Sequence, residues 1–126
     1  MATYNHYYEL PVYKTCRAFR KKISAIARKN FPKLEEYHLK MQVLDSSRSI
    51  TANIAEGFGR LHYQENIRFC RQSRGSFSET LEHMITAYDE KYIAREILSE
   101  INRDCLKQLN GYIKYLKAAK LGGNNN

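Results

Sequence analysis

The chain has 126 residues, the size of one domain, and its 43% hydrophobic content excludes a largely disordered protein. Six glycines and two prolines are too few for a turn-rich sandwich or barrel, and the short uncharged apolar runs exclude a membrane span. The net charge of +8 favours polyanionic partners, of which RNA and DNA are the most common.

Three breaks divide the chain into four segments with helical periodicity. They lie at residues 30–32, where Pro32 disfavours helix, at the glycines of 57–60, and at the polar stretch 89–91. No alternating run long enough for a strand lies between them. The pattern predicts an all-α, antiparallel up-down-up-down four-helix bundle. The expected organisation is an N-terminal arm over 1–8, the bundle over 9–120 and a disordered tail over 121–126.

The first predicted helix, about Leu10 to Lys29, is amphipathic. Apolar residues from Cys16 to Ala27 fall within an arc of about 100° when successive residues turn by about 100°. The opposite face, an arc of about 60°, carries the cations Lys14, Arg17, Lys21 and Arg28.

The two middle segments are less basic. The second predicted helix, about Lys33 to Glu56, is rich in small residues in its latter half, which lets a neighbouring helix approach closely. The third runs from about Tyr63 to Tyr88. Arg74 falls on its apolar stripe, where a charge requires a partner or an interface.

The fourth predicted helix, about Arg95 to Lys120, has a second basic face. Its outward arc of about 80° carries Arg103, Lys107, Lys114 and Lys117. Gly111 in this helix costs about 1 kcal/mol relative to alanine. Because the first and last helices are neighbours in such a bundle, we expect their cations to form one wall.

Enzyme and cofactor motifs are absent from the sequence. Cys16, Cys70 and Cys105 are scattered on apolar stripes, so we expect inert thiols and no disulfide framework. Glu35 and His38 form a single Glu-x-x-His spacing, too little for a metal site. We therefore expect no enzyme, no cofactor and no metal. The N-terminal residues have no basic segment followed by an apolar one, so we also expect a cytoplasmic protein without membrane attachment.

Ten tyrosines are many for this length. Tyr4, Tyr7 and Tyr8 precede the first helix, where packing on the bundle is the favoured interpretation. The alternative is a stacking platform for single-stranded nucleic acid, because bases stack on aromatic rings beside cations.

One segment, from Ser46 to Arg60, carries a signature. It resembles the family of 23S rRNA intervening-sequence proteins, whose core reads Ser-Ile-x-x-Asn-Ile-Ala-Glu-Gly-x-Gly-Arg. The run Arg74-Gly75-Ser76-Phe77 agrees as well, and the resemblance covers about residues 9–118. Lys91 stands where the family usually has a turn glycine, and Ala94 replaces a polar helix cap.

The resemblance implies a non-enzymatic four-helix bundle that assembles into a homopentamer. It also implies a likeness in fold to the accessory variability protein of diversity-generating retroelements, a basic pentamer that binds a reverse transcriptase and nucleic acid. From the signature and the residues that accompany it, we expect structural or oligomer-forming roles for Arg48, Asn53, Glu56, Gly57, Gly59, Arg60, Arg74 and Glu79.

The sequence thus predicts an oligomeric, non-catalytic protein that binds nucleic acid, with RNA favoured by the family association. The eight cations of the two basic faces would contact phosphates and give little sequence choice. The alternative is an adaptor that docks on an acidic protein partner, such as a reverse transcriptase.

Overall fold

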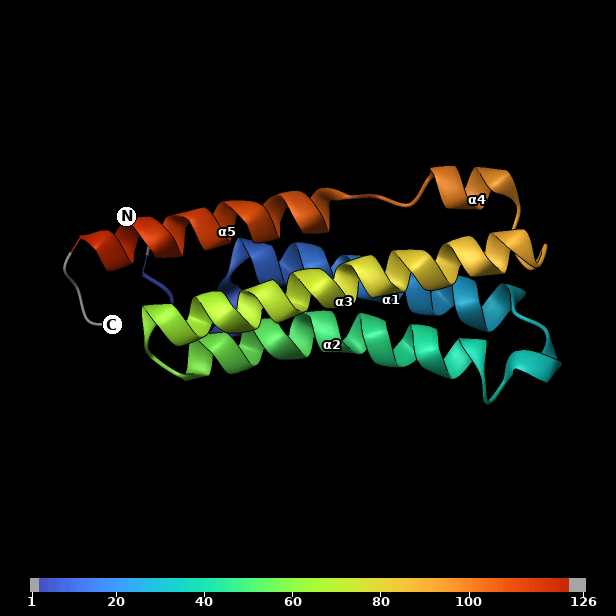
Figure 1. Ribbon diagram of the computed structural model, residues 1–126, viewed down its shortest axis with the longest axis horizontal. Helices are drawn as coiled ribbons and strands as arrows, with labels where there is room; N and C mark the ends of the chain where they lie inside the picture. Colours follow the sequence, from blue (N-terminus) through green and yellow to red (C-terminus); the bar gives the residue numbers. More distant parts are fainter. Residues whose placement is uncertain (1–2, 123–126) are drawn as a thin grey trace.

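The computed structural model describes residues 3–122, and within them the protein is a helical bundle without strands. The long helices are α1 (Pro11–Asn30), α2 (Leu39–Gly59), α3 (Tyr63–Asp89) and α5 (Asp104–Leu121). The shorter ones are η1 (Tyr7–Glu9), η2 (Lys33–Glu35) and α4 (Arg95–Ser99). Successive long helices run in opposite directions along the molecule (Figure 1). The predicted all-α bundle of four helices is confirmed.

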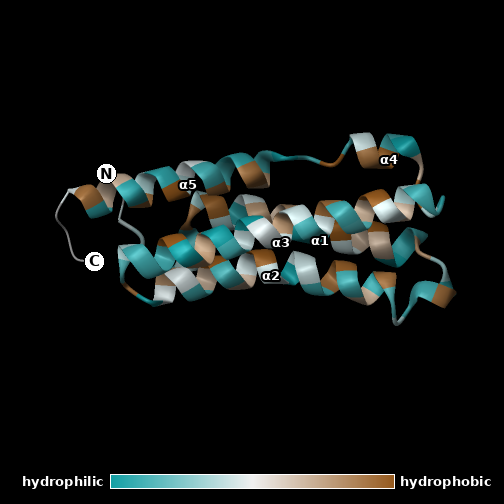
Figure 2. Ribbon diagram, viewed as in Figure 1, coloured by the Kyte–Doolittle hydropathy of each residue, from teal (hydrophilic) through white to brown (hydrophobic). Residues whose placement is uncertain are grey.

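Each long helix turns an apolar stripe toward the bundle axis and a polar face outward. Figure 2 shows the two residue types alternating around the helices. The largest fully buried side chains include Ile23, Ile50, Phe77, Met84 and Leu109, at least one from each long helix. The Phe77 ring packs against Phe19 with 4.8 Å between ring centroids. This burial supplies most of the stabilisation of the fold.

The contact between α2 and α3 is built from small side chains. A Cβ atom at Gly57 would lie 2.9 Å from the Phe69 Cβ and 2.7 Å from the Asn66 Oδ1, so only glycine fits there. Buried hydroxyl groups also join the helices, because Ser73 Oγ donates to the carbonyl oxygen of Ile50 at 2.6 Å. The sequence prediction of close approach by the small residues of α2 agrees with this packing.

The second helix begins later than predicted, at Leu39 instead of Lys33, and it continues to Gly59 instead of Glu56. Residues Lys33–Glu35 form a 3₁₀ turn after the extended Pro32. The Glu35 carboxylate accepts a hydrogen bond from the backbone N–H of Leu39 at 3.1 Å and caps the true helix start.

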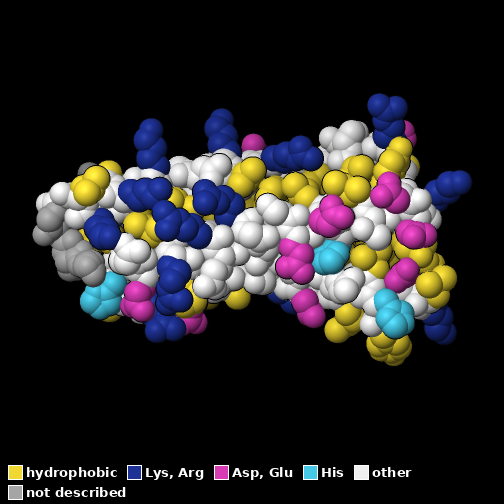
Figure 3. All heavy atoms as spheres, in the orientation of Figure 1, with side chains coloured by type: hydrophobic (Ala, Val, Ile, Leu, Met, Phe, Trp, Pro, Cys, Tyr) yellow, Lys and Arg dark blue, Asp and Glu magenta, His cyan; other side chains and the backbone are white. Residues whose placement is uncertain are grey.

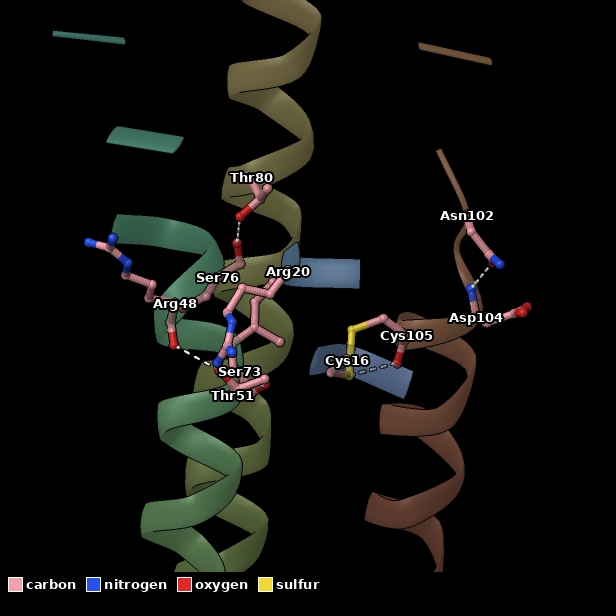
Figure 4. The surroundings of a disulfide bond; sticks show 11 residues. Cys16, Arg20, Arg48, Thr51, Ser73, Ser76, Thr80, Asn102, Asp104 and Cys105 are labelled. Atoms are coloured by element: carbon pink, nitrogen blue, oxygen red, sulfur yellow. Dashed lines mark hydrogen bonds between the residues drawn. A yellow bond between two sulfur atoms is a disulfide. The ribbon is translucent and has the colours of Figure 1, made fainter. Parts of the chain in front are cut away.

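The fourth helix was wrongly predicted to be continuous. It is divided into α4 and α5 by residues 100–103, and Arg103 is the residue before α5 instead of a helical one. Asn102 Oδ1 accepts a hydrogen bond from the backbone N–H of Asp104 at 2.7 Å (Figure 4). Asparagine and aspartate offer the backbone such local alternatives to helix, and Ile101 remains buried although it lies in the break.

Two turns use left-handed backbone at residues with side chains. Lys91 has φ 65° in the turn between α3 and α4, and Leu61 has φ 62° between α2 and α3. Lys91 occupies the position where the family resemblance called for glycine, so the backbone conformation explains that preference. Ala94, the N-cap residue of α4, makes no side-chain capping hydrogen bond.

The expectation of no disulfide was wrong. Cys16 of α1 and Cys105 in the first turn of α5 form a disulfide between residues 89 positions apart (Figure 4). Both are buried, as their positions on apolar stripes predicted. Cys70 is free and buried, and its burial raises the pKa of the thiol to about 12, so it is protonated and unreactive near neutral pH.

The N-terminal arm packs on the bundle in part, and the described C-terminal end follows α5 closely. Tyr4 and Tyr7 pack against the bundle core, the favoured interpretation of these tyrosines, whereas Tyr8 is 52% exposed. Leu121 is the last residue of α5, and residues 123–126 of the expected tail lie outside the described part. No helix within residues 3–122 is long and apolar enough to cross a bilayer.

Candidate nucleic-acid interface

A small hollow between α1 and α2 gathers basic side chains. Its volume is about 360 Å³, and we call it the cationic hollow. Its lining residues are Arg20, Lys21, Ser24, Ala25, Arg28, Leu44, Ser47 and Arg48. Four of these side chains are basic and none is acidic, although α1 and α2 come from different predicted segments.

The hydrogen bonds of the basic residues in the hollow go to neutral acceptors. Arg20 Nη1 donates to Thr51 Oγ1 at 2.7 Å, and Figure 4 shows this side chain reaching Thr51 of α2, while the Arg48 side chain points away from it. Arg28 Nε donates to Ser24 Oγ at 3.0 Å. These acceptors are neutral, and none of the ion pairs among residues 3–122 involves a basic residue of the hollow. An anion placed there would offset the repulsion between like charges.

The cations of the two predicted basic faces remain at the surface, and three of them line openings of the molecule. The exposed predicted cations are Lys14, Arg17, Lys21, Arg28, Arg103, Lys107, Lys114 and Lys117. Lys21 and Arg28 of α1 share the cationic hollow with Arg48 of α2. Lys107 of α5 instead lines a separate cleft beside the start of α1. The structure therefore brings the α1 cations together with α2, and it places Lys107 at another opening.

Sequence analysis missed that two arginines, Arg60 and Arg68, meet at one aromatic ring, and each of them also pairs with a glutamate of its own helical turn. The guanidinium groups of Arg60 and Arg68 lie over the ring of Phe69, at 5.1 and 4.8 Å from its centroid. Arg74 Nη1 donates to Asn110 Oδ1 of α5 at 2.9 Å, which gives this charge on the apolar stripe its partner. These arginine contacts gave no signal in the sequence because the charges of the whole third segment nearly cancel.

Charge is divided along the length of the bundle. Figure 3 shows lysine and arginine gathered over the N-terminal half of α3 and along α5, and aspartate and glutamate over the other end. The acidic residues of the C-terminal half of α3 are Glu79, Glu82 and Asp89. This separation of charge could have been predicted from the sequence if the basic and acidic residues of the third helix had been counted in each half of the helix separately.

The signature residues of α2 make contacts within the chain. Asn53 Nδ2 donates to the carbonyl oxygen and hydroxyl of Ser49 at 2.9 and 3.0 Å, and Ser49 in turn bonds to Ser76 of α3 at 2.8 Å. Glu56 pairs with Arg60 on the same exposed helix face at 3.1 Å. These bonds join successive turns in the second half of α2 and connect the middle of α2 to α3.

The other residues expected to have structural roles are spread over the bundle. Gly57 provides the close contact to α3, whereas a Cβ at Gly59 would meet nothing within 4 Å. Glu79 faces His83 one turn later at 3.5 Å. Arg48 belongs to the cationic hollow instead of the α2–α3 contact.

A family model described as 23S rRNA-intervening sequence protein matches residues 8–113, most of the bundle including the signature and the cationic hollow. The chain belongs to this family. At its signature glycine, Gly57, α2 and α3 approach too closely for a Cβ atom, so the family motif is a packing motif at that position. The chain has no match among curated proteins.

Within residues 3–122, no group of three or more His, Cys, Asp or Glu side chains is arranged to hold a metal ion. Glu35, part of the weak Glu-x-x-His spacing, instead accepts a hydrogen bond from the Tyr92 hydroxyl at 2.7 Å. This bond lowers the pKa of the Glu35 carboxyl and raises the pKa of Tyr92 to about 12. The pair ties η2 to the segment after α3, which is a structural use of both residues.

Proposed function

We propose that this protein is a non-catalytic nucleic-acid-binding protein that prefers RNA and grips it through phosphate contacts. The observation that carries the proposal is the cationic hollow, where α1 and α2 gather four basic side chains and no acidic one. Phosphate oxygens satisfy such guanidinium and ammonium groups through charge-assisted hydrogen bonds. The family description, which connects its members with 23S rRNA, supports RNA as the polyanion.

The basic surfaces beyond the hollow extend this contact. Lys14 and Arg17 continue the basic face of α1, and Lys114 and Lys117 lie on the exposed face of α5. Because lysine and arginine meet phosphates without reading base edges, binding has low sequence preference. The proposal includes a cytoplasmic homopentamer, in which several weak sites add through avidity.

Charge reversal tests the proposal with a matched control. Lys21→Glu and Lys114→Glu each weaken binding of a fluorescent single-stranded RNA in an anisotropy titration. Each lost phosphate contact flattens the slope of log affinity against log salt by about 0.7. The control, Lys91→Glu, makes the same charge change at an exposed position toward the acidic end and leaves that slope unchanged.

Equal slopes for all four proteins contradict the proposal. If the wild-type protein ignores RNA and DNA but captures a specific acidic protein, the adaptor function replaces it. Light scattering on the same samples measures the assembly state, with a pentamer expected.

A further inference from the structure

A second and larger opening lies where α5 extends past the start of α1. It has a volume of about 720 Å³, within the range of small-ligand pockets, and we call it the tyrosine cleft. Residues from the N-terminal arm, the turn between α2 and α3, and α5 form its walls. Four tyrosines line it: Tyr4, Tyr63, Tyr112 and Tyr115.

The polar groups of the cleft can meet a planar heterocycle. Asn66, which is 8% exposed, donates through Nδ2 to the Tyr112 hydroxyl at 3.2 Å. A phenol that accepts a hydrogen bond keeps its own proton to donate, and burial raises the pKa of Tyr112 to about 12, so that proton is retained near neutral pH. Gln108 adds an amide, with both a donor and an acceptor, to the lining.

The charge of the cleft is suited to an anionic strand. No acidic residue lines it, and Lys107 does. On α5, Lys107 and Lys114 are seven residues apart and share one face, so the basic face of this helix borders the cleft. A nucleic acid strand bound by these lysines would pass the tyrosines of the cleft.

Gly111 keeps the cleft open. A Cβ atom at this helical position would meet nothing within 4 Å, so packing does not require glycine there. A larger side chain on this wall would project into the space that the tyrosines surround. The same openness makes Gly111 a site where the cleft can be filled without disturbing the core.

We propose that the tyrosine cleft receives an unpaired base of the RNA strand whose phosphates the basic faces hold. This inference rests on the proposed function and adds to it a preference for single-stranded RNA. Base–aromatic stacking tolerates any sequence because every base has a π-face, in keeping with low sequence preference. Duplex RNA, whose bases are stacked and paired, gains nothing from the cleft.

The test separates bases from phosphates. Oligouridine and inorganic polyphosphate of matched length are titrated against the wild type, Gly111→Leu and Gly75→Leu. Gly75 is the matched control, since it is also helical, its Cβ would also meet nothing within 4 Å, and it does not line the cleft. We expect Gly111→Leu to lose about tenfold in affinity for oligouridine and nothing for polyphosphate, and Gly75→Leu to match the wild type.

A second variant guards against misfolding of the first. Tyr115→Leu removes an aromatic ring from the cleft, and Tyr37→Leu removes one that is 82% exposed at the other end of the bundle. Tyr115→Leu weakens oligouridine binding, whereas Tyr37→Leu does not. Thermal unfolding of each variant confirms that the fold is retained.

The outcomes distinguish the two proposals. Wild-type affinity of Gly111→Leu and Tyr115→Leu for oligouridine overturns the base site and leaves phosphate binding intact. An equal loss for oligouridine and polyphosphate also overturns it, because the loss is then not specific to bases. If free uridine monophosphate binds as tightly as oligouridine, and Gly111→Leu weakens that binding, the cleft is a mononucleotide site, which contradicts the proposal that it receives a base of an RNA strand. A wild type that binds neither polymer contradicts both proposals.

Discussion

The α2–α3 contact and the tyrosine cleft use glycine for opposite purposes. At Gly57, Asn66 and Phe69 of α3 occupy the space that a side chain would need, so the two helices approach closely. At Gly111 nothing fills the space, and a cleft of about 720 Å³ lies beside it. The α2–α3 contact is thus specified by tight packing, while α5 on its other side leaves room for a ligand. The lesson is that a glycine in a helix acquires its meaning only from what the neighbouring helix places against it.

The largest expected effect concerns the attachment of α5, which forms one wall of the cleft, to the rest of the bundle. The Cys16–Cys105 disulfide joins α5 to α1 and closes a long loop. Because such a cross-link restricts the unfolded chain, its reduction lowers the free energy of unfolding by about 3 kcal/mol. Urea titrations with and without dithiothreitol measure this difference.

Cys70→Ala is the control for reduction, since Cys70 is free. Its midpoint shifts with dithiothreitol as much as that of the wild type. A midpoint that does not change with reductant in both proteins would show that the disulfide between α1 and α5 does not stabilise the fold.

The next effect contrasts the glycines directly. Gly57→Ala forces a Cβ to within 2.9 Å of the Phe69 Cβ and lowers the free energy of unfolding by about 2 kcal/mol. Gly75→Ala, where the new Cβ meets nothing, raises it by about 0.5–1 kcal/mol, because alanine is the better helix former. Chemical denaturation of the two variants gives the comparison, and shifts of the same sign would contradict it.

Alkaline pH probes the Glu35–Tyr92 hydrogen bond at the far end of the bundle. The bond raises the pKa of Tyr92 from 10.0 to about 12, so the folded protein holds this proton more firmly than the unfolded chain. The resulting stability is fully present below pH 10 and is lost as the pH rises toward 12. Thermal unfolding between pH 9 and 12 measures the decline.

Tyr92→Phe is less sensitive to pH over that range, because it lacks the hydroxyl. It retains a smaller decline from Tyr112, whose pKa burial raises to about 12 as well. A variant that loses stability as steeply as the wild type would show that Tyr92 does not titrate with folding.

The smallest effect is at the turn before α4. Lys91 adopts φ 65°, which costs a residue with a Cβ about 1 kcal/mol relative to glycine. Lys91→Gly raises the thermal midpoint, whereas Lys91→Ala, which removes the charge but keeps the Cβ, does not. Equal midpoints for the two variants would assign any change to charge instead of backbone.

Much of the fold was predictable because apolar periodicity reports burial directly. On the predicted stripes of α1 and α3, Cys16, Ile23 and Phe77 are buried as expected, whereas Ile85 and Tyr88 near the end of the α3 stripe are exposed. The break before α5 was missed because Ile101 continues the apolar spacing while Asn102 redirects the backbone. Hydrogen bonds from short polar side chains decide such breaks, and spacing alone does not record them.

The candidate site was only partly predictable. Helical spacing placed Lys21 and Arg28 on one exposed face, as found. Helical spacing did not reveal that Arg20 of α1 and Arg48 of α2 line the same hollow as these two residues, because packing sets the rotation of α1 relative to α2. The tyrosine cleft depends on three separated segments meeting at one end, which no local pattern encodes.

The salt dependence of RNA binding tests the central claim most directly. The affinity of the wild-type protein for oligouridine, measured by anisotropy over a range of potassium chloride concentrations, gives the slope of log affinity against log salt. Phosphate contacts through the basic faces predict a steep negative slope, about −0.7 for each phosphate engaged. An affinity that does not change with salt would contradict the account.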